Sequence, residues 1–165
     1  MNRGFVFAVV LVATGLLTPT MVTASEPASV VQASPNQVVV ERLYRAFAAG
    51  DGATIATILS SDLVWFEAEN HPYADLNPYN GPAAVVEGVF GRIGAAFPDF
   101  VVTPTTYLSS GDTVAAQGRY TATNIATGET MDAQFVHFFT VRDGRITGFQ
   151  QYTDTAQWID VVTPD

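Results

Sequence analysis

The 165-residue sequence contains no cysteine, and its seven basic residues are all arginine. The lack of thiols excludes disulfide scaffolds, thiolate metal sites and cysteine nucleophiles. Sixteen acidic residues bring the formal charge to -9 at pH 7. Because there is no basic run to bind a phosphate backbone, we expect no nucleic-acid partner.

Charged residues are scarce as well, at 14%, whereas hydrophobic residues make up 48% of the chain. This balance is typical of a chain that folds around a core, and the length suits one domain. Only two histidines are present, and no metal-ligand spacing accompanies them. We therefore expect neither a bound metal nor another cofactor.

Residues 1–24 are typical of a secretory signal peptide, because Arg3 precedes a short apolar stretch that ends before a polar patch. The apolar stretch is too short for a comfortable membrane span, although an uncleaved N-terminal anchor is the alternative. No other stretch is long enough to span a bilayer. We expect a secreted or periplasmic protein that is cut after Ala24. The predicted parts are the signal peptide (1–24), a tether (25–33), the folded domain (34–162) and a tail (163–165).

Hydrophobic spacing and capping residues predict three helices in the first half of the domain. Ser34 and Pro35 are typical of a helix start, and helical periodicity continues to near Gly50. Asp51 is suited to cap a second, short helix. The predicted helices span about 35–50, 52–59 and 82–97, with a strand over 63–68 and a long loop over 69–81.

From Phe100 onward the hydrophobic pattern alternates with a period of two, and short turns separate the segments. The predicted strands span roughly 100–109, 113–124, 130–142 and 145–154. Short connections make these strands antiparallel, and their length requires the sheet to twist and curl. We therefore predict an α+β fold in which a curved, mainly antiparallel sheet wraps three N-terminal helices around an internal pocket.

Glu67 lies on the same predicted strand face as Trp65, which favours an inward side chain. The opposite face, with Val64 and Phe66, is equally apolar, so an outward Glu67 is the alternative. A lone buried carboxylate is costly, and an inward Glu67 is therefore better explained as a base than as packing. Burial would raise its pKa, and a nearby cation would lower it.

His137 lies on the more apolar face of its predicted strand, together with Phe135 and Phe139. This face is expected to turn toward the helices. His137 is then either an ordinary core histidine that is hydrogen-bonded to a neighbour or a functional side chain that faces the pocket.

Three further positions are open in the sequence. Neither face of the strand over 113–124 is clearly the core face, so Arg119 is either a surface charge or an internal counter-charge for Glu67. The face of the last strand that holds Phe149 and Gln151 is equally ambiguous. Tyr73 belongs to the long loop, which is either a lid over the pocket or a plain surface loop.

The order of these features over residues 36–162 resembles the SnoaL-like group of the NTF2-like superfamily. The resemblance is carried by Ala49-Gly50-Asp51, by Trp65-Phe66-Glu67, and by the strand and turn over 135–146. It implies a cone-shaped α+β fold. The superfamily includes ketosteroid isomerase, polyketide cyclases, scytalone dehydratase, limonene epoxide hydrolase and non-catalytic nuclear transport factors.

Ketosteroid isomerase offers residue-by-residue expectations, because its pKa tuning is well understood. The resemblance places Glu67 at the position of its general base and His137 at the position of its oxyanion-hole aspartic acid. Leu43 stands where the isomerase has its oxyanion tyrosine. Tyr44 is adjacent, but it points ~100° around the helix.

These observations leave three hypotheses. The first is acid/base isomerase, cyclase or dehydratase chemistry on a small hydrophobic carbonyl compound, without a cofactor. The second is a non-catalytic module that binds a small apolar ligand, and the third is a homodimer with a filled interior. The catalytic candidates are Glu67, His137 and Arg119, and the candidates for substrate binding are Trp65, Tyr73, Phe90, Phe135, Phe139, Phe149 and Gln151.

Overall fold

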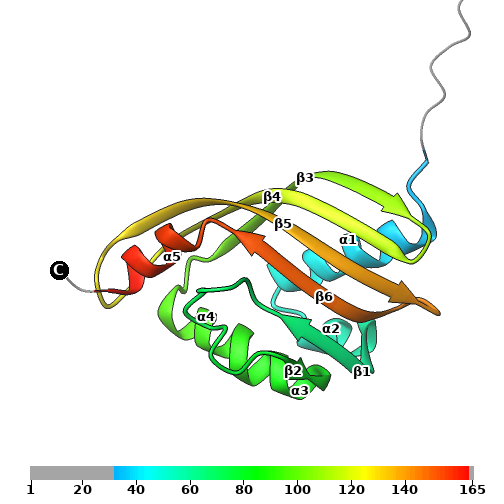
Figure 1. Ribbon diagram of the computed structural model, residues 1–165, viewed down its shortest axis with the longest axis horizontal. Coiled ribbons are helices and arrows are strands. Elements are labelled where there is room, and N and C mark those ends of the chain that lie inside the picture. Colours follow the sequence, from blue (N-terminus) through cyan, green and yellow to red (C-terminus); the bar gives the residue numbers. More distant parts are fainter. Residues whose placement is uncertain (1–31, 164–165) are drawn as a thin grey trace, which may run out of the picture. The chain divides into compact units, whose positions relative to one another are not determined.

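The computed structural model describes residues 32–163, which belong to one compact unit (Figure 1). The predicted signal peptide and almost all of the predicted tether lie outside the described residues, so both stay predictions. Among the helices of the described part, none combines the length and apolarity that a membrane crossing requires.

Helices come first, a strand pair and further helical turns follow, and the four long strands and a last helix complete the described chain. The helices are α1 (Pro35–Ala48), α2 (Gly52–Ile58), α3 (Gly81–Val85), α4 (Gly91–Ala96) and α5 (Thr155–Val162), and a π-helical turn, η1 (Val86–Phe90), joins α3 to α4. The strands are β1 (Leu59–Phe66), β2 (Tyr79–Asn80), β3 (Val101–Ser110), β4 (Thr113–Thr123), β5 (Thr130–Arg142) and β6 (Arg145–Thr153).

The first two helices begin at the predicted caps. The Ser34 hydroxyl accepts a hydrogen bond from the amide of Gln37 at 3.1 Å, and the Asp51 carboxylate accepts one from the amide of Thr54 at 2.9 Å. The helix predicted over 82–97 exists as α3, η1 and α4 in succession. The wider turn of η1 includes Gly88, where an added Cβ would come within 2.3 Å of the Tyr79 ring.

One mixed sheet, in the order β2-β1-β6-β5-β4-β3, curves over the helices (Figure 1). The four long strands from β3 to β6 are antiparallel neighbours, as predicted, whereas β1 pairs with β6 in parallel. Helix α1 packs against β3, β4, β5 and β6. The α+β architecture with a curved, mainly antiparallel sheet is therefore confirmed.

Helix α5 was not predicted, and it follows the last predicted strand. Asp154 caps it by accepting a hydrogen bond from the amide of Gln157 at 3.4 Å. Its apolar residues Trp158 and Val161 are both buried, and α5 packs against β5. The helix thus closes one end of the sheet with a tryptophan that no predicted element contained.

Side-chain alternation settles the strand faces that the sequence left open. Glu67, Phe149 and Gln151 are buried on the inner side, and His137 is buried as predicted. On β4, the buried positions include Gly118 and Tyr120, so Arg119 between them points outward.

Candidate active site

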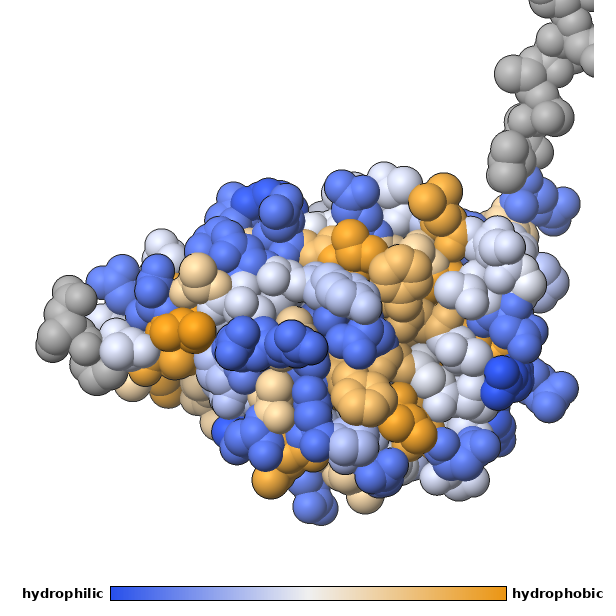
Figure 2. Space-filling model, viewed as in Figure 1, coloured by the Kyte–Doolittle hydropathy of each residue, from blue (hydrophilic) through white to orange (hydrophobic). Residues whose placement is uncertain are grey.

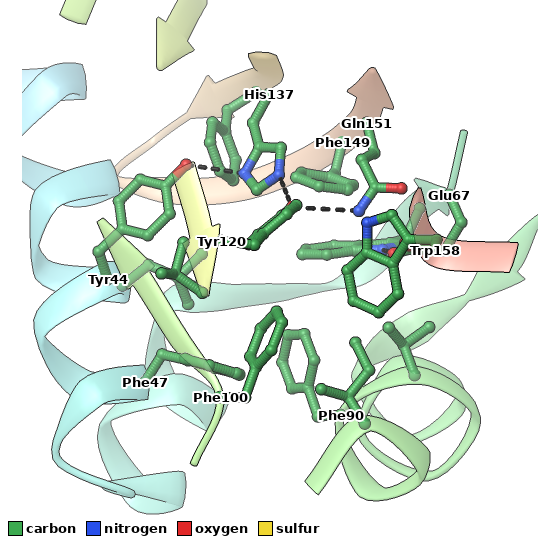
Figure 3. A pocket seen from close by; sticks show the side chains of 16 residues that line it. Tyr44, Phe47, Glu67, Phe90, Phe100, Tyr120, His137, Phe149, Gln151 and Trp158 are labelled. Carbon is green, nitrogen blue, oxygen red and sulfur yellow. Dashed lines mark hydrogen bonds between the residues drawn. The ribbon is translucent and has the colours of Figure 1, made fainter. Parts of the chain in front are cut away.

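A cavity of about 60 Å³ lies between the helices and the concave side of the sheet (Figure 3). This volume holds a few water molecules or a fragment of a few heavy atoms. The side chains with polar atoms in its lining are Tyr44, Trp65, Glu67, Tyr120, His137, Gln151 and Trp158, and the apolar ones are Leu43, Phe47, Val89, Phe90, Ile93, Phe100, Val102, Phe139 and Phe149.

Glu67 follows the last residue of β1 and is only 2% exposed. Its Oε1 accepts a hydrogen bond from the indole N–H of Trp65 at 2.6 Å. The side chain of Asn77 holds the Glu67 backbone, accepting from its N–H at 3.0 Å and donating to its carbonyl at 2.8 Å. The second carboxyl oxygen, Oε2, has no hydrogen-bond partner among the described residues, and it is free to accept a proton.

Burial raises the pKa of Glu67 to about 7, because the apolar surroundings disfavour the charged carboxylate. The hydrogen bond from Trp65 and the nearby amide of Gln151 act in the opposite direction and stabilise the charge. A carboxyl group with this pKa is present in both protonation states near neutral pH. Such a group can take a proton from a substrate and give it back.

His71 lies beside Glu67, with its Nδ1 3.5 Å from Glu67 Oε2. The same Nδ1 accepts a hydrogen bond from the backbone N–H of Tyr73 at 3.2 Å. Burial lowers the pKa of His71 to about 3, and its ring packs on that of Trp158 with centroids 4.3 Å apart. His71 is therefore a neutral neighbour of Glu67.

His137 is held between two phenols. Its Nδ1 lies 2.8 Å from the hydroxyl of Tyr44, and its Nε2 contacts the hydroxyl of Tyr120 (Figure 3). The amide of Gln151 donates to the Tyr120 hydroxyl at 3.1 Å and accepts from the backbone N–H of Ala68 at 3.1 Å. Burial lowers the pKa of His137 to about 3, so the imidazole is neutral, and both of its nitrogens are engaged.

Arg119 is not part of this site. Its guanidinium forms an exposed ion pair with Asp132 on the neighbouring strand, with Nε 2.6 Å from Oδ1. The prediction of Arg119 as an internal counter-charge for Glu67 is therefore wrong. The side chain that points into the pocket is that of Tyr120, the next residue along β4.

Two of the proposed substrate-binding residues also lie outside the cavity lining. Phe135 is buried and stacks on the ring of His137 at 4.2 Å, so it supports the imidazole from one side. Tyr73 is buried in the loop between β1 and β2, where the guanidinium of Arg92 lies 4.7 Å from its ring centroid. The other five, Trp65, Phe90, Phe139, Phe149 and Gln151, line the cavity together with Glu67 and His137.

Three polar groups of the cavity were not predicted as site residues: Tyr44, Tyr120 and Trp158. The cavity is broad enough at α1 to include both Leu43 and Tyr44, so the rotation between neighbouring helical residues did not exclude the phenol. The signal for Trp158 was present, because Asp154 is a helix-capping residue and Trp158 and Val161 are spaced as one face of a helix.

A family model for the SnoaL-like domain matches residues 40–149 of the chain. The chain belongs to the SnoaL-like domain family. No curated protein matches this SnoaL-like chain by sequence.

Solved structures share the fold of this SnoaL-like domain. An NTF2-like protein of Burkholderia thailandensis is 28% identical, with a TM-score of 0.74 over 81% of this chain and 100% of that one. TerC, co-crystallised with polyporic acid, is 25% identical, with a TM-score of 0.70 over 78% of this chain and 98% of TerC. IdmH of Streptomyces antibioticus, a proposed polyketide cyclase, is 22% identical, with a TM-score of 0.64 over 77% of this chain and 97% of IdmH. The NTF2-like fold implied by the resemblance is confirmed.

Proposed function

We propose that this SnoaL-like domain moves a proton on a small, neutral, largely apolar carbonyl compound, as an isomerase, cyclase or dehydratase does. The observation that carries the proposal is the buried Oε2 of Glu67, which lacks a hydrogen-bond partner among the described residues and belongs to a carboxyl group that lines an apolar cavity. A pKa of about 7 suits this group to act as a general base at neutral pH.

In the proposed reaction, Glu67 removes a proton from the carbon next to the carbonyl group. The electrons of the broken C–H bond move toward the carbonyl oxygen, where a hydroxyl of the His137 network stabilises the developing charge. Glu67 then returns the proton to another position. Trp65, Phe139 and Phe149 surround the site with apolar surface, which keeps water out and strengthens these electrostatic interactions.

The lining also limits the substrate class. It contains no arginine, and the one side chain that ionises readily is acidic, so an anionic substrate would find no counter-charge. The partly exposed rings of Phe47, Phe90 and Phe100 border the cavity (Figure 3), and a ligand of more than a few heavy atoms requires them to move. The co-crystallisation of TerC with polyporic acid and the proposed polyketide cyclase activity of IdmH support a small organic ligand here.

Deuterium exchange tests this function without knowledge of the natural substrate. A panel of small neutral ketones and 1,3-diketones is incubated with the protein in D₂O, and incorporation is followed by mass spectrometry. We expect the wild-type protein to accelerate exchange at the carbon next to the carbonyl, and Glu67→Gln to lose roughly 10²–10⁴-fold of that acceleration. Equal exchange by the two proteins for every accelerated compound would contradict the proposal.

The second candidate is a binding module without catalysis. The observation that favours it is the polar network of the cavity, in which both nitrogens of the neutral His137 are already bonded to the hydroxyls of Tyr44 and Tyr120. A bound compound that raises the melting temperature, and that is recovered unchanged after long incubation in D₂O, would favour binding over catalysis.

We also propose that the mature domain is exported and forms a homodimer through the outer face of the sheet. Phe66, Phe138 and Tyr152 are exposed there by 37%, 43% and 57%, and Phe66 and Phe138 both pair with Gln150. Hydrophobic patches also interrupt the hydrophilic surface on the face seen in Figure 2. Light scattering of the wild type and of Phe138→Ser tests the dimer, and N-terminal sequencing of the secreted product tests cleavage after Ala24.

A further inference from the structure

The hydrogen-bond network around His137 has a direction, because a backbone amide stands at one end. The N–H of Ala68 can only donate, so the Gln151 oxygen that it contacts at 3.1 Å must accept. This fixes the orientation of the Gln151 amide, whose NH₂ group donates to the hydroxyl oxygen of Tyr120 at 3.1 Å. Tyr120 is therefore an acceptor toward Gln151, and it still has one proton to donate.

The acceptor within reach of that proton, among the described residues, is Nε2 of His137. If Tyr120 donates to Nε2, the proton of the neutral imidazole is on Nδ1, and Nδ1–H donates to the hydroxyl oxygen of Tyr44 at 2.8 Å. The hydroxyl proton of Tyr44 then has no acceptor among the described residues, and Tyr44 lines the cavity.

The opposite direction would leave the Tyr120 proton without an acceptor. Tyr120 is only 3% exposed, whereas Tyr44 is partly exposed, so an unpaired donor costs more at Tyr120 than at Tyr44. A water molecule or a ligand oxygen in the cavity can satisfy Tyr44. The first direction, from Ala68 through Gln151, Tyr120 and His137 to Tyr44, is therefore the favoured one.

We propose that Tyr44, and not His137, donates the hydrogen bond to the oxygen of the bound compound. The inference rests on the proposed function and names the oxyanion-stabilising residue of that site. When Glu67 takes the proton from carbon, the C–H electron pair moves to the carbonyl oxygen. Tyr44 keeps its own proton and shares it with this oxygen, and Glu67 later protonates a different atom. Tyr120 and Gln151 act as positioning residues, because they hold the imidazole in the tautomer that donates to Tyr44.

The proposal predicts that the two histidines of the chain are opposite tautomers. His71 accepts the Tyr73 amide at Nδ1 and must carry its proton on Nε2, whereas His137 must carry its proton on Nδ1. Long-range ¹H–¹⁵N spectra of labelled protein at pH 7 read out both rings, and the variant His71→Gln assigns them. A protonated Nε2 on His137 would overturn the proposal, because Tyr44 would then donate to His137.

Binding of 4-nitrophenol, whose oxygen mimics that of an enolate, tests the donor without requiring turnover. We expect Tyr44→Phe to weaken binding by at least 10-fold. The matched control is Tyr107→Phe, since the ring of Tyr107 packs 6.2 Å from that of Tyr44 but does not line the cavity. The affinity of this variant for 4-nitrophenol should equal that of wild type. Equal affinity of Tyr44→Phe and wild type, or no binding by wild type, would overturn the proposal.

The last test measures kcat and KM for deuterium exchange, with any compound whose exchange the wild type accelerates. Loss of one oxyanion donor costs roughly 10²–10³-fold in kcat, and we expect this loss for Tyr44→Phe with little change in KM. An unchanged kcat would overturn the role of Tyr44. If His137 carries its proton on Nδ1 and Tyr44→Phe weakens 4-nitrophenol binding, while no compound exchanges, then the proposed catalysis by Glu67 has failed and the donor assignment stands.

Discussion

Glu67 Oε2 lies 3.5 Å from Nδ1 of His71, and the two groups form no ion pair at neutral pH because His71 is neutral. The His71 nitrogen uses its lone pair to accept the Tyr73 amide, so it carries no proton to share with the carboxylate. Burial moves the pKa of Glu67 up to about 7 and that of His71 down to about 3. The carboxyl group is therefore a base of moderate strength whose pKa is not lowered by a cation.

The raised pKa of Glu67 makes the stability of the protein depend on pH. In the folded protein Glu67 holds its proton up to about pH 7, whereas in the unfolded chain it loses it near pH 4.5, so stability decreases as pH rises between these values. Replacing Glu67 by Gln removes this decrease. We expect the free energy of unfolding of the variant to rise by about 3 kcal/mol relative to that of wild type as the pH is raised from 4 to 8.

Urea denaturation of both proteins at several pH values measures this difference. The lowered pKa values of His71 and His137 make stability decrease as pH falls from 6.5 toward 3, but this effect is common to both proteins and cancels in the comparison. A stability difference between the two proteins that does not change with pH would mean that Glu67 has an ordinary pKa.

Catalysis should depend on pH in the opposite sense to stability. The base must be deprotonated to take a proton, so the rate of deuterium exchange is expected to rise with pH and to level off above about pH 7. His137 contributes no step in this range, because its pKa is lowered to about 3. A rate that is already constant from pH 5 upward would assign the proton transfer to another group.

The variant His137→Leu should destabilise the fold as well as the site. It leaves the hydroxyls of Tyr44 and Tyr120 without their shared partner, at a cost of roughly 1–3 kcal/mol for each unpaired group. The exposed residue Gln134 provides the control, because Gln134→Leu changes a side chain on the outer face of the same strand. Urea denaturation measures both, and equal stability of the two variants would show that the network contributes nothing.

Arg119 should be dispensable. Its ion pair with Asp132 is exposed, and such pairs are worth about 0–1 kcal/mol. We expect Arg119→Gln to exchange deuterium at the wild-type rate and to unfold within about 0.5 kcal/mol of wild type. A large loss of activity would show that Arg119 reaches the substrate in a conformation different from the one described.

Phe90 should control the size of the accepted ligand. Its ring packs against Trp65 at 5.5 Å and against Phe47 at 5.2 Å, on the side of the cavity formed by η1. We expect Phe90→Ala to enlarge the cavity and to bind bicyclic apolar ketones more tightly than wild type, as measured by thermal shift at matched concentrations. If the variant prefers ligands of the same size as wild type does, then Phe90 does not limit the size of the ligand.

The sequence was sufficient for the architecture because its local signals agree with each other. Ser34 and Asp51 cap the first two helices, and strict alternation fixes the inner face of β5, which holds His137. The sequence could not decide the face of β4, since its small and polar residues make both faces similar. Packing decides it, because Gly118 lies under the ring of Phe135 and Tyr120 reaches His137.

The polar network of the site was also beyond the sequence. Tyr44, Tyr120 and Gln151 come from α1, β4 and β6, and their hydroxyl and amide groups meet only because the sheet curves around α1. No spacing along the chain encodes these contacts. The position of Glu67 could be predicted, whereas its free oxygen and its neutral neighbour His71 depend on the three-dimensional packing of the loop that follows β1.

The proposed function depends on a carboxyl base in the cavity whose pKa is near neutrality, and titration of Glu67 measures that pKa. The carboxyl carbon of Glu67, assigned in ¹³C spectra by its loss in Glu67→Gln, is followed from pH 4 to pH 9. We expect a midpoint at about 7. A midpoint close to 4.5 would contradict it, because the carboxyl group would then be solvated or paired with a cation.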